Sequence, residues 1–263
     1  MKKQRPTCDR AFTVVELLVT ITIVGLLAAL LLPVLGRSKE EARLTQCLGN
    51  LRQIGCGFEM YLDDQGDRFP SHPVNWTGWQ YGGGDPNWTN LLAAYSDLDL
   101  VASTNRPLWR YLRTSEVFHC PADRGMDLRP VYPVSFVSFF RTIGTSYGYN
   151  HTPWSRTKEL ADDPDNGLAE KRYSWVPEPA RHILLFEPPA LPYEADDPQA
   201  VYVLWHHNAG NSTVHSPSEI RQKVVSPILF VDGHASVRDF TATVKSQWPA
   251  EPTANWVWYK PAH

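Results

Sequence analysis

The chain has 263 residues, of which 43% are hydrophobic and 20% charged, a composition typical of a folded globular protein. Lys and Arg number 25 against 28 Asp and Glu, and the formal net charge is −3, so the basic excess that nucleic-acid phosphates require is absent. The four cysteines are too few for a disulfide-dense scaffold, and their spacing contains no CxxC pair of the kind that zinc ribbons use. These numbers exclude wholesale disorder and remove nucleic acid from the expected partners.

A long uncharged segment lies near the N-terminus, from Leu17 to Gly36. As a helix, its twenty residues would extend about 30 Å, the thickness of the hydrocarbon core of a bilayer. Residues 1–11 contain four basic residues and one acidic residue, and this basic excess predicts a cytoplasmic N-terminus with the rest of the chain on the far side. Two other interpretations are a buried core helix and a cleaved signal peptide, but the segment has no polar face and begins beside Glu16, a charge for which a signal peptide has no use.

The stretch from Arg10 to Leu18 resembles the processing site of type IV prepilins and type II secretion pseudopilins. In that family a short basic leader is cut before a Phe, the new N-terminus is methylated, and a Glu follows four residues later. The resemblance implies a cytoplasmic leader at residues 1–11 ending in Ala11, a methylated first mature residue Phe12, and Glu16 as the family's carboxylate. The family usually has Gly where this chain has Ala11. A carboxylate at Glu16 can then pair with the α-amino group of a neighbouring subunit, a partner that cleavage itself creates.

A single helix is expected from Phe12 to about Leu62. Residues 12–36 would form its membrane or filament-core part, with a bend or local melting near Pro33 and Gly36. Residues 37–62 carry apolar side chains at three- and four-residue intervals and would pack on the head. The acidic residues 63–67 that follow could form either a calcium loop or a solvated turn that ends the helix. The solvated turn is favoured, because the segment lacks the twelve-residue ligand pattern of a calcium loop.

Residues 63–263 are expected to form a loop-rich α+β head, in which a small antiparallel sheet packs on the helix. A long loop covers Phe69–Gly84, short helices are expected at Asn90–Tyr95 and Pro107–Arg113, and strands at Val134–Phe140, His182–Phe186, Val201–His206, Pro227–Val231 and His234–Phe240. The pair Asp232-Gly233 between the last two strands predicts a C-terminal hairpin near residues 227–240. The chain also contains the segments Asn50–Ile54, Met60–Tyr61, Cys120–Asp123, Ser146–Asn150 and Phe230–His234. In these segments it resembles the bacterial prepilin-like proteins whose C-terminal signature is a His, nine residues and Asp-Gly. His207 resembles the start of that signature, but 24 residues separate it from Asp232.

Other chemistry has little support in the sequence. Four histidines, His206, His207, His215 and His234, suggest a metal site, but no HxxxH or HExxH pattern fixes their geometry, so surface or hairpin histidines are favoured and no metal or cofactor is predicted. No nucleophile elbow, phosphate loop or spaced carboxylate pair indicates an enzyme. Once the leader is removed, three cysteines remain outside the cytoplasm. One disulfide between Cys47 and Cys120 and three buried thiols are the two alternatives.

These observations predict a pilin-like structural subunit of a type II secretion pseudopilus or a type IV pilus-like filament. It would be a single-pass protein of the bacterial cytoplasmic membrane, with the lipid bilayer, a prepilin peptidase and other pilin-like subunits as partners. One alternative is a membrane-anchored binding protein that holds a glycan on exposed Trp76, Trp79 and Trp88. A secreted enzyme behind a cleaved signal peptide is a third possibility.

Overall fold

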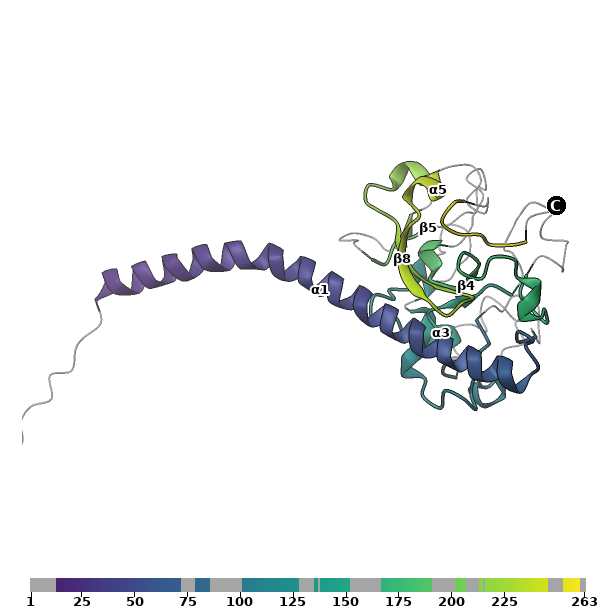
Figure 1. Cartoon of the computed structure of the whole chain (residues 1–263). Helices are drawn as coiled ribbons and strands as arrows, with labels where there is room; N and C mark the ends of the chain where they lie inside the picture. Colours follow the sequence, from purple (N-terminus) through teal and green to yellow (C-terminus); the bar gives the residue numbers. More distant parts are fainter. Residues whose placement is uncertain are drawn as a thin grey trace, which may run out of the picture. The chain divides into compact units, whose positions relative to one another are not determined.

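The computed structural model describes residues 13–71, 79–85, 101–127, 135–136, 138–151, 167–190, 202–206, 213–214, 216–245 and 253–260. The chain divides into two compact units, residues 1–42 and residues 43–263. One helix, α1 (Val14–Asp64), contributes residues to both units (Figure 1). Together with an antiparallel sheet of four strands, it gives the α+β, pilin-like layout that the sequence predicts.

Helix α1 is continuous through Pro33 and Gly36. Local melting at these residues, one of the two forms expected from the sequence, is therefore wrong, and a bend there stays a prediction. The helix ends in a turn in which the Asp67 N–H donates to the Leu62 carbonyl oxygen at 2.8 Å, with Gly66 at φ +61°. A backbone hydrogen bond thus closes the last helical turn, and the preference for a solvated turn over a calcium loop stays a prediction.

The second unit is built on a sheet with the strand order β3 (Gly148–Tyr149), β4 (Ile183–Phe186), β7 (Val225–Phe230), β8 (Ala235–Asp239), and every pair in it is antiparallel. The apolar runs that predicted β4 and β7 are buried at every position. Gly233 has φ +86° in the turn that joins β7 to β8, which confirms the predicted hairpin. The C-terminal segment extends this region, since Val257 bridges to His182 in parallel.

Two short ladders lie outside this sheet. β1 (Met126–Asp127) pairs with β2 (Ser135–Phe136), and β5 (Tyr202–Val203) pairs with β6 (Thr213–Val214). The remaining described elements are helices α3 (Phe139–Ile143) and α5 (Thr241–Lys245) and the 3₁₀ turns η1 (Ser103–Asn105), η2 (Glu116–Phe118), η3 (Tyr173–Trp175), η4 (Pro188–Ala190) and η5 (Pro217–Glu219).

Three predicted elements differ from the structure. The strand expected at Val134–Phe140 is replaced by the two residues of β2 and by α3, because Ser138 caps a helix that begins at Phe139. The helix expected at Pro107–Arg113 is a series of turns that ends with the Leu112 N–H bonded to the Leu108 carbonyl oxygen. The strand expected at Val201–His206 is reduced to β5, and the helix expected at Asn90–Tyr95 lies outside the described residues.

The outer part of α1 packs against the sheet within the second unit. Its buried face consists of Leu44, Cys47, Asn50, Leu51, Ile54, Gly55, Gly57, Phe58 and Leu62. A Cβ added at Gly55 would lie 3.2 Å from the Leu229 side chain of β7, so helix and sheet meet at close range there. The three- and four-residue spacing that predicted this face is therefore confirmed, and the face joins the main hydrophobic core.

Candidate functional site

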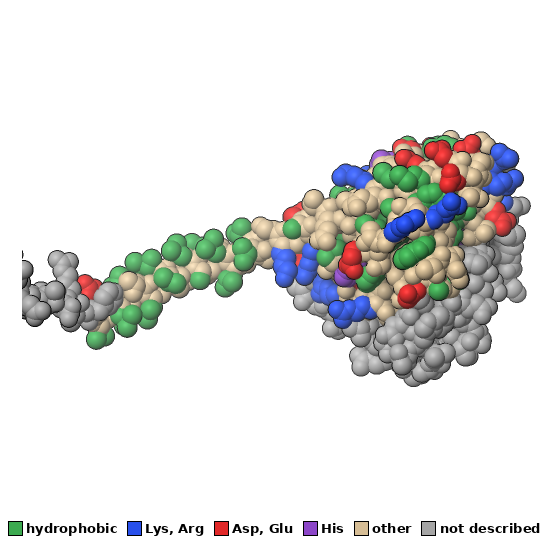
Figure 2. Space-filling view, turned by 90° about the horizontal axis from the view of Figure 1, so that it is seen from below, with side chains coloured by type: hydrophobic (Ala, Val, Ile, Leu, Met, Phe, Trp, Pro, Cys, Tyr) green, Lys and Arg blue, Asp and Glu red, His purple; other side chains and the backbone are tan. Residues whose placement is uncertain are grey.

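The N-terminal part of α1 is the first candidate functional surface. Large apolar side chains from Val14 to Leu35 are all exposed, and Leu30 keeps 72% of its surface accessible. Figure 2 shows hydrophobic side chains along this part of the helix, and the first basic residue after it in the chain is Arg37. Among the described residues, α1 is the one helix that is long enough and apolar enough to cross a membrane. Such a surface is unfavourable in water and favourable in lipid or against like helices.

The polar groups within this segment are satisfied by the helix itself. The Thr20 hydroxyl donates to the Leu17 carbonyl oxygen at 2.7 Å, and the Thr22 hydroxyl donates to the Leu18 carbonyl oxygen at 2.7 Å. A helix in lipid must satisfy its polar groups internally, because no water is present to do so. The two threonines, which are the only polar side chains of the predicted span, therefore do not count against membrane insertion.

Glu16 lies at the beginning of α1 and forms a reciprocal cap with Thr13. The Thr13 N–H donates to Glu16 Oε2 at 2.9 Å and the Thr13 hydroxyl donates to the same oxygen at 2.8 Å, while the Glu16 N–H donates to Thr13 Oγ1 at 3.2 Å. This is the capping-box arrangement, which satisfies free donors at a helix start. The structure thus gives Glu16 a local partner in the single chain, which sequence reasoning did not anticipate. Ala11 and Phe12 lie outside the described residues.

A second candidate site lies in the head, where Cys47 and Cys120 meet. Their sulfur atoms are 2.8 Å apart and fully buried, and both residues are free cysteines in this structure. The covalent bond between them therefore stays a prediction. The third cysteine, Cys56, is exposed on the same helix and is also free.

Glu187 and His206 complete this buried group. Glu187 follows β4 and His206 follows β5, and Glu187 Oε2 lies 2.8 Å from His206 Nε2 with both side chains inaccessible to solvent. The prediction of a surface histidine is wrong for His206, which is 1% exposed. Sequence reasoning missed Glu187 entirely, since a lone Glu after an apolar strand carries no recognisable signal. His207 and His215 lie outside the described residues.

The electrostatics of the group follow from its burial. Burial alone lowers the pKa of the His206 imidazole, but the negative charge of Glu187 outweighs burial, and with Cys47 it raises that pKa to about 10. Burial, the contact with Cys47 and the charge of Glu187 raise the pKa of the Cys120 thiol well above its ordinary value. Without a further cation, the side chains would thus stay as a thiol and an imidazolium paired with a carboxylate.

The other predicted site residues lie in the hairpin and the loops. His234 Nδ1 is 2.6 Å from Asp232 Oδ1, on the exposed turn between β7 and β8, and Gly233 provides the positive φ of that turn. The signature of a His, nine residues and Asp-Gly is not shown, since 24 residues separate His207 from Asp232. Trp79 is only 8% exposed and packs against Phe139 and Phe186, with ring centroids 5.0 and 6.1 Å away, so it does not offer a glycan platform. Trp76 and Trp88 are not among the described residues.

A comparison with known protein families identifies a motif in the N-terminal segment of the chain. The model for the prokaryotic N-terminal methylation motif matches residues 7–32, which include Ala11, Phe12 and Glu16. No curated protein and no solved structure matches the chain. The chain thus carries a prepilin-type N-terminal methylation motif that includes the beginning of a long N-terminal helix with an apolar first part, and this combination indicates a type IV pilin-like or pseudopilin-like protein.

Proposed function

We propose that the protein is a structural subunit of a type II secretion pseudopilus or of a type IV pilus-like filament. A prepilin peptidase would cut the chain between Ala11 and Phe12 and the new N-terminus would be methylated. The observation that carries this proposal is the methylation motif, which extends into a helix whose N-terminal apolar side chains are exposed on every turn. The role is structural and calls for no catalytic centre.

The exposed part of α1 supports two successive environments. In the cytoplasmic membrane its apolar side chains would contact lipid, with the basic leader on the cytoplasmic side and the head outside. In a filament the same side chains would contact the helices of neighbouring subunits. Because lipid and leucine side chains are similarly apolar, the exchange costs little free energy, and specific packing decides the outcome.

Glu16 would provide the specific contact in such a filament. Its carboxylate accepts hydrogen bonds only from Thr13 among the described residues. After cleavage, the α-amino group on Phe12 of a neighbouring chain would offer a positive charge in the same apolar surroundings, where an unpaired carboxylate is costly. Glu16 would thus exchange a local cap for an ion pair between subunits.

Mass spectrometry of the membrane-fraction product tests the processing step. The full chain is expressed in a host that has a prepilin peptidase, with a peptidase-deficient host as the control. We expect a mature chain that begins at Phe12 and carries one methyl group in the first host, and the uncut chain in the second. A chain that begins beyond Gly36 in both hosts would instead identify a conventional signal peptide and contradict the proposal.

Crosslinking between subunits tests the assembly step. A photo-reactive residue at Leu27 would report on helix contacts in chains that carry Glu16→Leu or, as a matched control, Glu41→Leu at an exposed position of the same helix. We expect normal cleavage in both variants, with crosslinked dimers lost only in the Glu16 variant. Equal crosslinking in the two variants would remove the role of Glu16 in assembly.

A further inference from the structure

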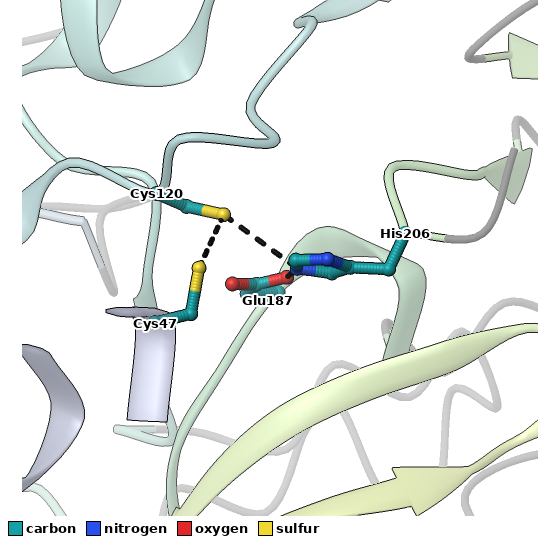
Figure 3. A group of neighbouring side chains, drawn as sticks. All are labelled: Cys47, Cys120, Glu187 and His206. Carbon is teal, nitrogen blue, oxygen red and sulfur yellow. Dashed lines mark hydrogen bonds and ion pairs between the residues drawn. The ribbon is translucent and has the colours of Figure 1, made fainter. Parts of the chain in front are cut away.

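The buried group in the head draws its side chains from four distant parts of the chain. Cys47 lies on α1, Cys120 follows η2, Glu187 follows β4 and His206 follows β5. Figure 3 shows the four side chains pointing toward one another from separate elements. All four residues are buried, and one potential ligand atom from each lies within 4.8 Å of all the others. Four ligand-type side chains have thus been collected around one point.

Glu187 is the feature that calls for a cation. Its side chain is inaccessible to solvent, yet neither carboxylate oxygen makes a hydrogen bond of normal geometry with the described residues. The nearest group is His206 Nε2, 2.8 Å from Oε2. A buried carboxylate is ordinarily paired, hydrogen-bonded or bound to a metal. The contact with His206 leaves Oε1 without a geometric hydrogen bond among the described residues.

The sulfur atoms face the same point as the carboxylate. Cys120 Sγ lies 2.8 Å from Cys47 Sγ and 3.6 Å from His206 Nε2. Two thiolates on a tetrahedral zinc ion would be about 3.8 Å apart, given Zn–S bonds of about 2.3 Å, whereas a disulfide holds its sulfurs about 2.05 Å apart. The observed separation lies between the two, so a small rotation of the side chains reaches either state.

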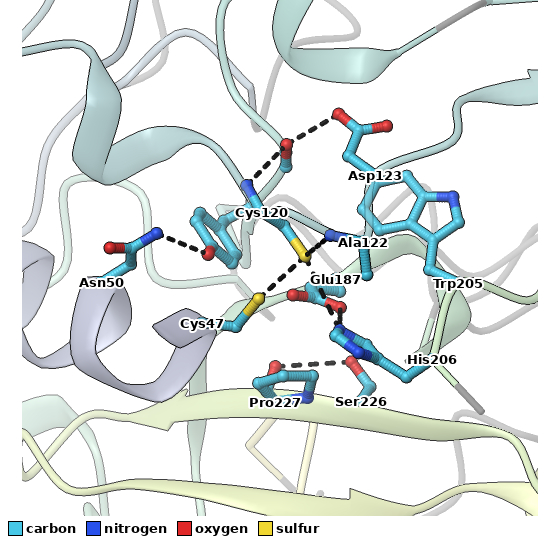
Figure 4. A network of polar contacts seen from close by, with 12 residues as sticks. Cys47, Asn50, Cys120, Ala122, Asp123, Glu187, Trp205, His206, Ser226 and Pro227 are labelled. Carbon is cyan, nitrogen blue, oxygen red and sulfur yellow. Dashed lines mark hydrogen bonds and ion pairs between the residues drawn. The ribbon is translucent and has the colours of Figure 1, made fainter. Parts of the chain in front are cut away.

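Hydrogen bonds around Cys47 and Cys120 fix the position of the two cysteines. The Ala122 N–H donates to Cys120 Sγ at 3.3 Å, and the Cys120 N–H donates to Ser146 Oγ at 3.1 Å (Figure 4). On α1, Asn50 lies one turn after Cys47 and donates to the His119 carbonyl oxygen at 2.9 Å. Hydrogen bonds of this kind orient metal ligands from outside the coordination shell. A disulfide alone would require none of them.

We propose that Cys47, Cys120, Glu187 and His206 bind one zinc ion. Two sulfurs, one imidazole nitrogen and one carboxylate oxygen form a ligand set that zinc takes in tetrahedral geometry. Both cysteines bind as thiolates and His206 binds through Nε2 as a neutral imidazole, so zinc binding releases the two thiol protons and the imidazolium proton to the solvent. With Zn²⁺, two thiolates and one carboxylate, the occupied site carries a net charge of −1.

The site is closed, which assigns the ion a structural role. All four ligands come from the protein and all are buried, so no position is left for water or substrate. The ion would connect α1 to the loops that follow η2, β4 and β5. A metal that binds only the folded chain contributes its binding free energy to folding. Zinc would thereby fasten the outer part of the helix to the head, whether or not the protein assembles into a filament.

Zinc analysis of the full-length chain in detergent micelles tests the proposal. The chain is grown with zinc in the medium, purified without chelators, and analysed for metal content and, after denaturation with a chelator, for free thiols by alkylation. We expect one zinc ion per chain and every cysteine alkylated. Cobalt added to the chelator-treated protein should give the visible bands of a tetrahedral site and thiolate-to-cobalt charge-transfer absorption in the near ultraviolet.

Single substitutions then locate the site. Cys120→Ser and His206→Gln should each weaken zinc binding by more than the roughly 10–100-fold typical of residues outside the coordination shell. Cys56→Ser, a matched change at the exposed cysteine of the same helix, should leave affinity unchanged. If a variant of a ligand residue fails to fold, the cobalt spectrum of the wild-type chain still tests the proposal, because it reports on the thiolate ligands without any substitution.

Two results would overturn the proposal. One is a wild-type chain without zinc that leaves Cys47 and Cys120 unalkylated, which would show the disulfide instead. The other is a chain with free thiols that takes up neither zinc nor cobalt. Neither result affects cleavage at Phe12, so this test is independent of the test of the proposed filament role.

Discussion

The Ser146 hydroxyl donates a 2.7 Å hydrogen bond to Asp123 Oδ2, and its oxygen accepts the N–H of Cys120. Asp123 also accepts from the Ser138 hydroxyl and from the N–H groups of Phe139 and Phe140, at the beginning of α3. One carboxylate thus holds the backbone at Cys120 and the start of a helix in fixed relation. The segment Cys120-Pro121-Ala122-Asp123 therefore connects the buried side chains around Cys120 to the beginning of α3.

Replacing Asp123 should destabilise the head strongly. Asp123→Ala removes the acceptor for several partly buried donors, and each donor left unpaired costs about 1–3 kcal/mol, so we expect a loss of at least 3 kcal/mol in the free energy of unfolding. Asp123→Asn keeps one oxygen and should lose less. Asp63→Ala, at an exposed position of α1, should change stability by less than about 0.5 kcal/mol. Denaturant unfolding of the three variants checks this, and a loss for Asp123→Ala as small as that of the control would contradict it.

Replacement by alanine should lower the stability of the protein at one glycine, Gly144, and raise it at another, Gly49. Gly144 ends α3 with φ +96°, and a Cβ there would lie 2.1 Å from the Gly84 carbonyl oxygen. Gly144→Ala should therefore lower stability by about 2 kcal/mol or more. Gly49 lies inside α1 with nothing within 4 Å of an added Cβ, so Gly49→Ala should raise stability by up to about 1 kcal/mol. Thermal unfolding compares the two directly, and a loss at Gly49 equal to that at Gly144 would refute the steric argument.

His182 should make the head less stable in acid. The residue is fully buried at the start of β4, and neither ring nitrogen has a hydrogen-bond partner among the described residues. Its ring lies 6.2 Å from that of Trp175, over which the Lys171 and Lys260 ammonium groups lie at 5.7 and 5.4 Å. Burial lowers the pKa of His182 from 6.5 to about 4. The folded state therefore holds this imidazole neutral at neutral pH.

The sign of the effect follows from the two pKa values. Between about pH 6.5 and pH 4 the unfolded chain binds a proton that the folded chain does not, so stability falls as the pH falls through this window. From about pH 7 to about pH 5, His182 should contribute a loss of about 2 kcal/mol. Unfolding free energies of the wild type and of His182→Leu at both pH values measure this contribution by difference. Identical pH dependence in the two proteins would exclude it.

Local patterns in the sequence determined much of this protein. The exposed segment of α1 and its methylation motif follow from an uncharged run behind a basic leader, and the β7–β8 hairpin follows from Asp232-Gly233 between two apolar runs. These features depend on residues close together in the chain, so their spacing is enough. The short run at Val134–Phe140 was misread because Ser138 and Asp123 cap α3, and Asp123 acts from 16 and 17 residues away.

Only the tertiary structure decided the composition of the buried group. Cys47 and Cys120 are 73 residues apart, and Cys120 and His206 are 86 residues apart. Their contact depends on how α1, the sheet and the loops pack together, and Glu187 joins them from a strand end that looks purely apolar in sequence. Local sequence periodicity does not predict these long-range contacts, because the free energy that brings the four side chains together comes from burial of the surrounding core.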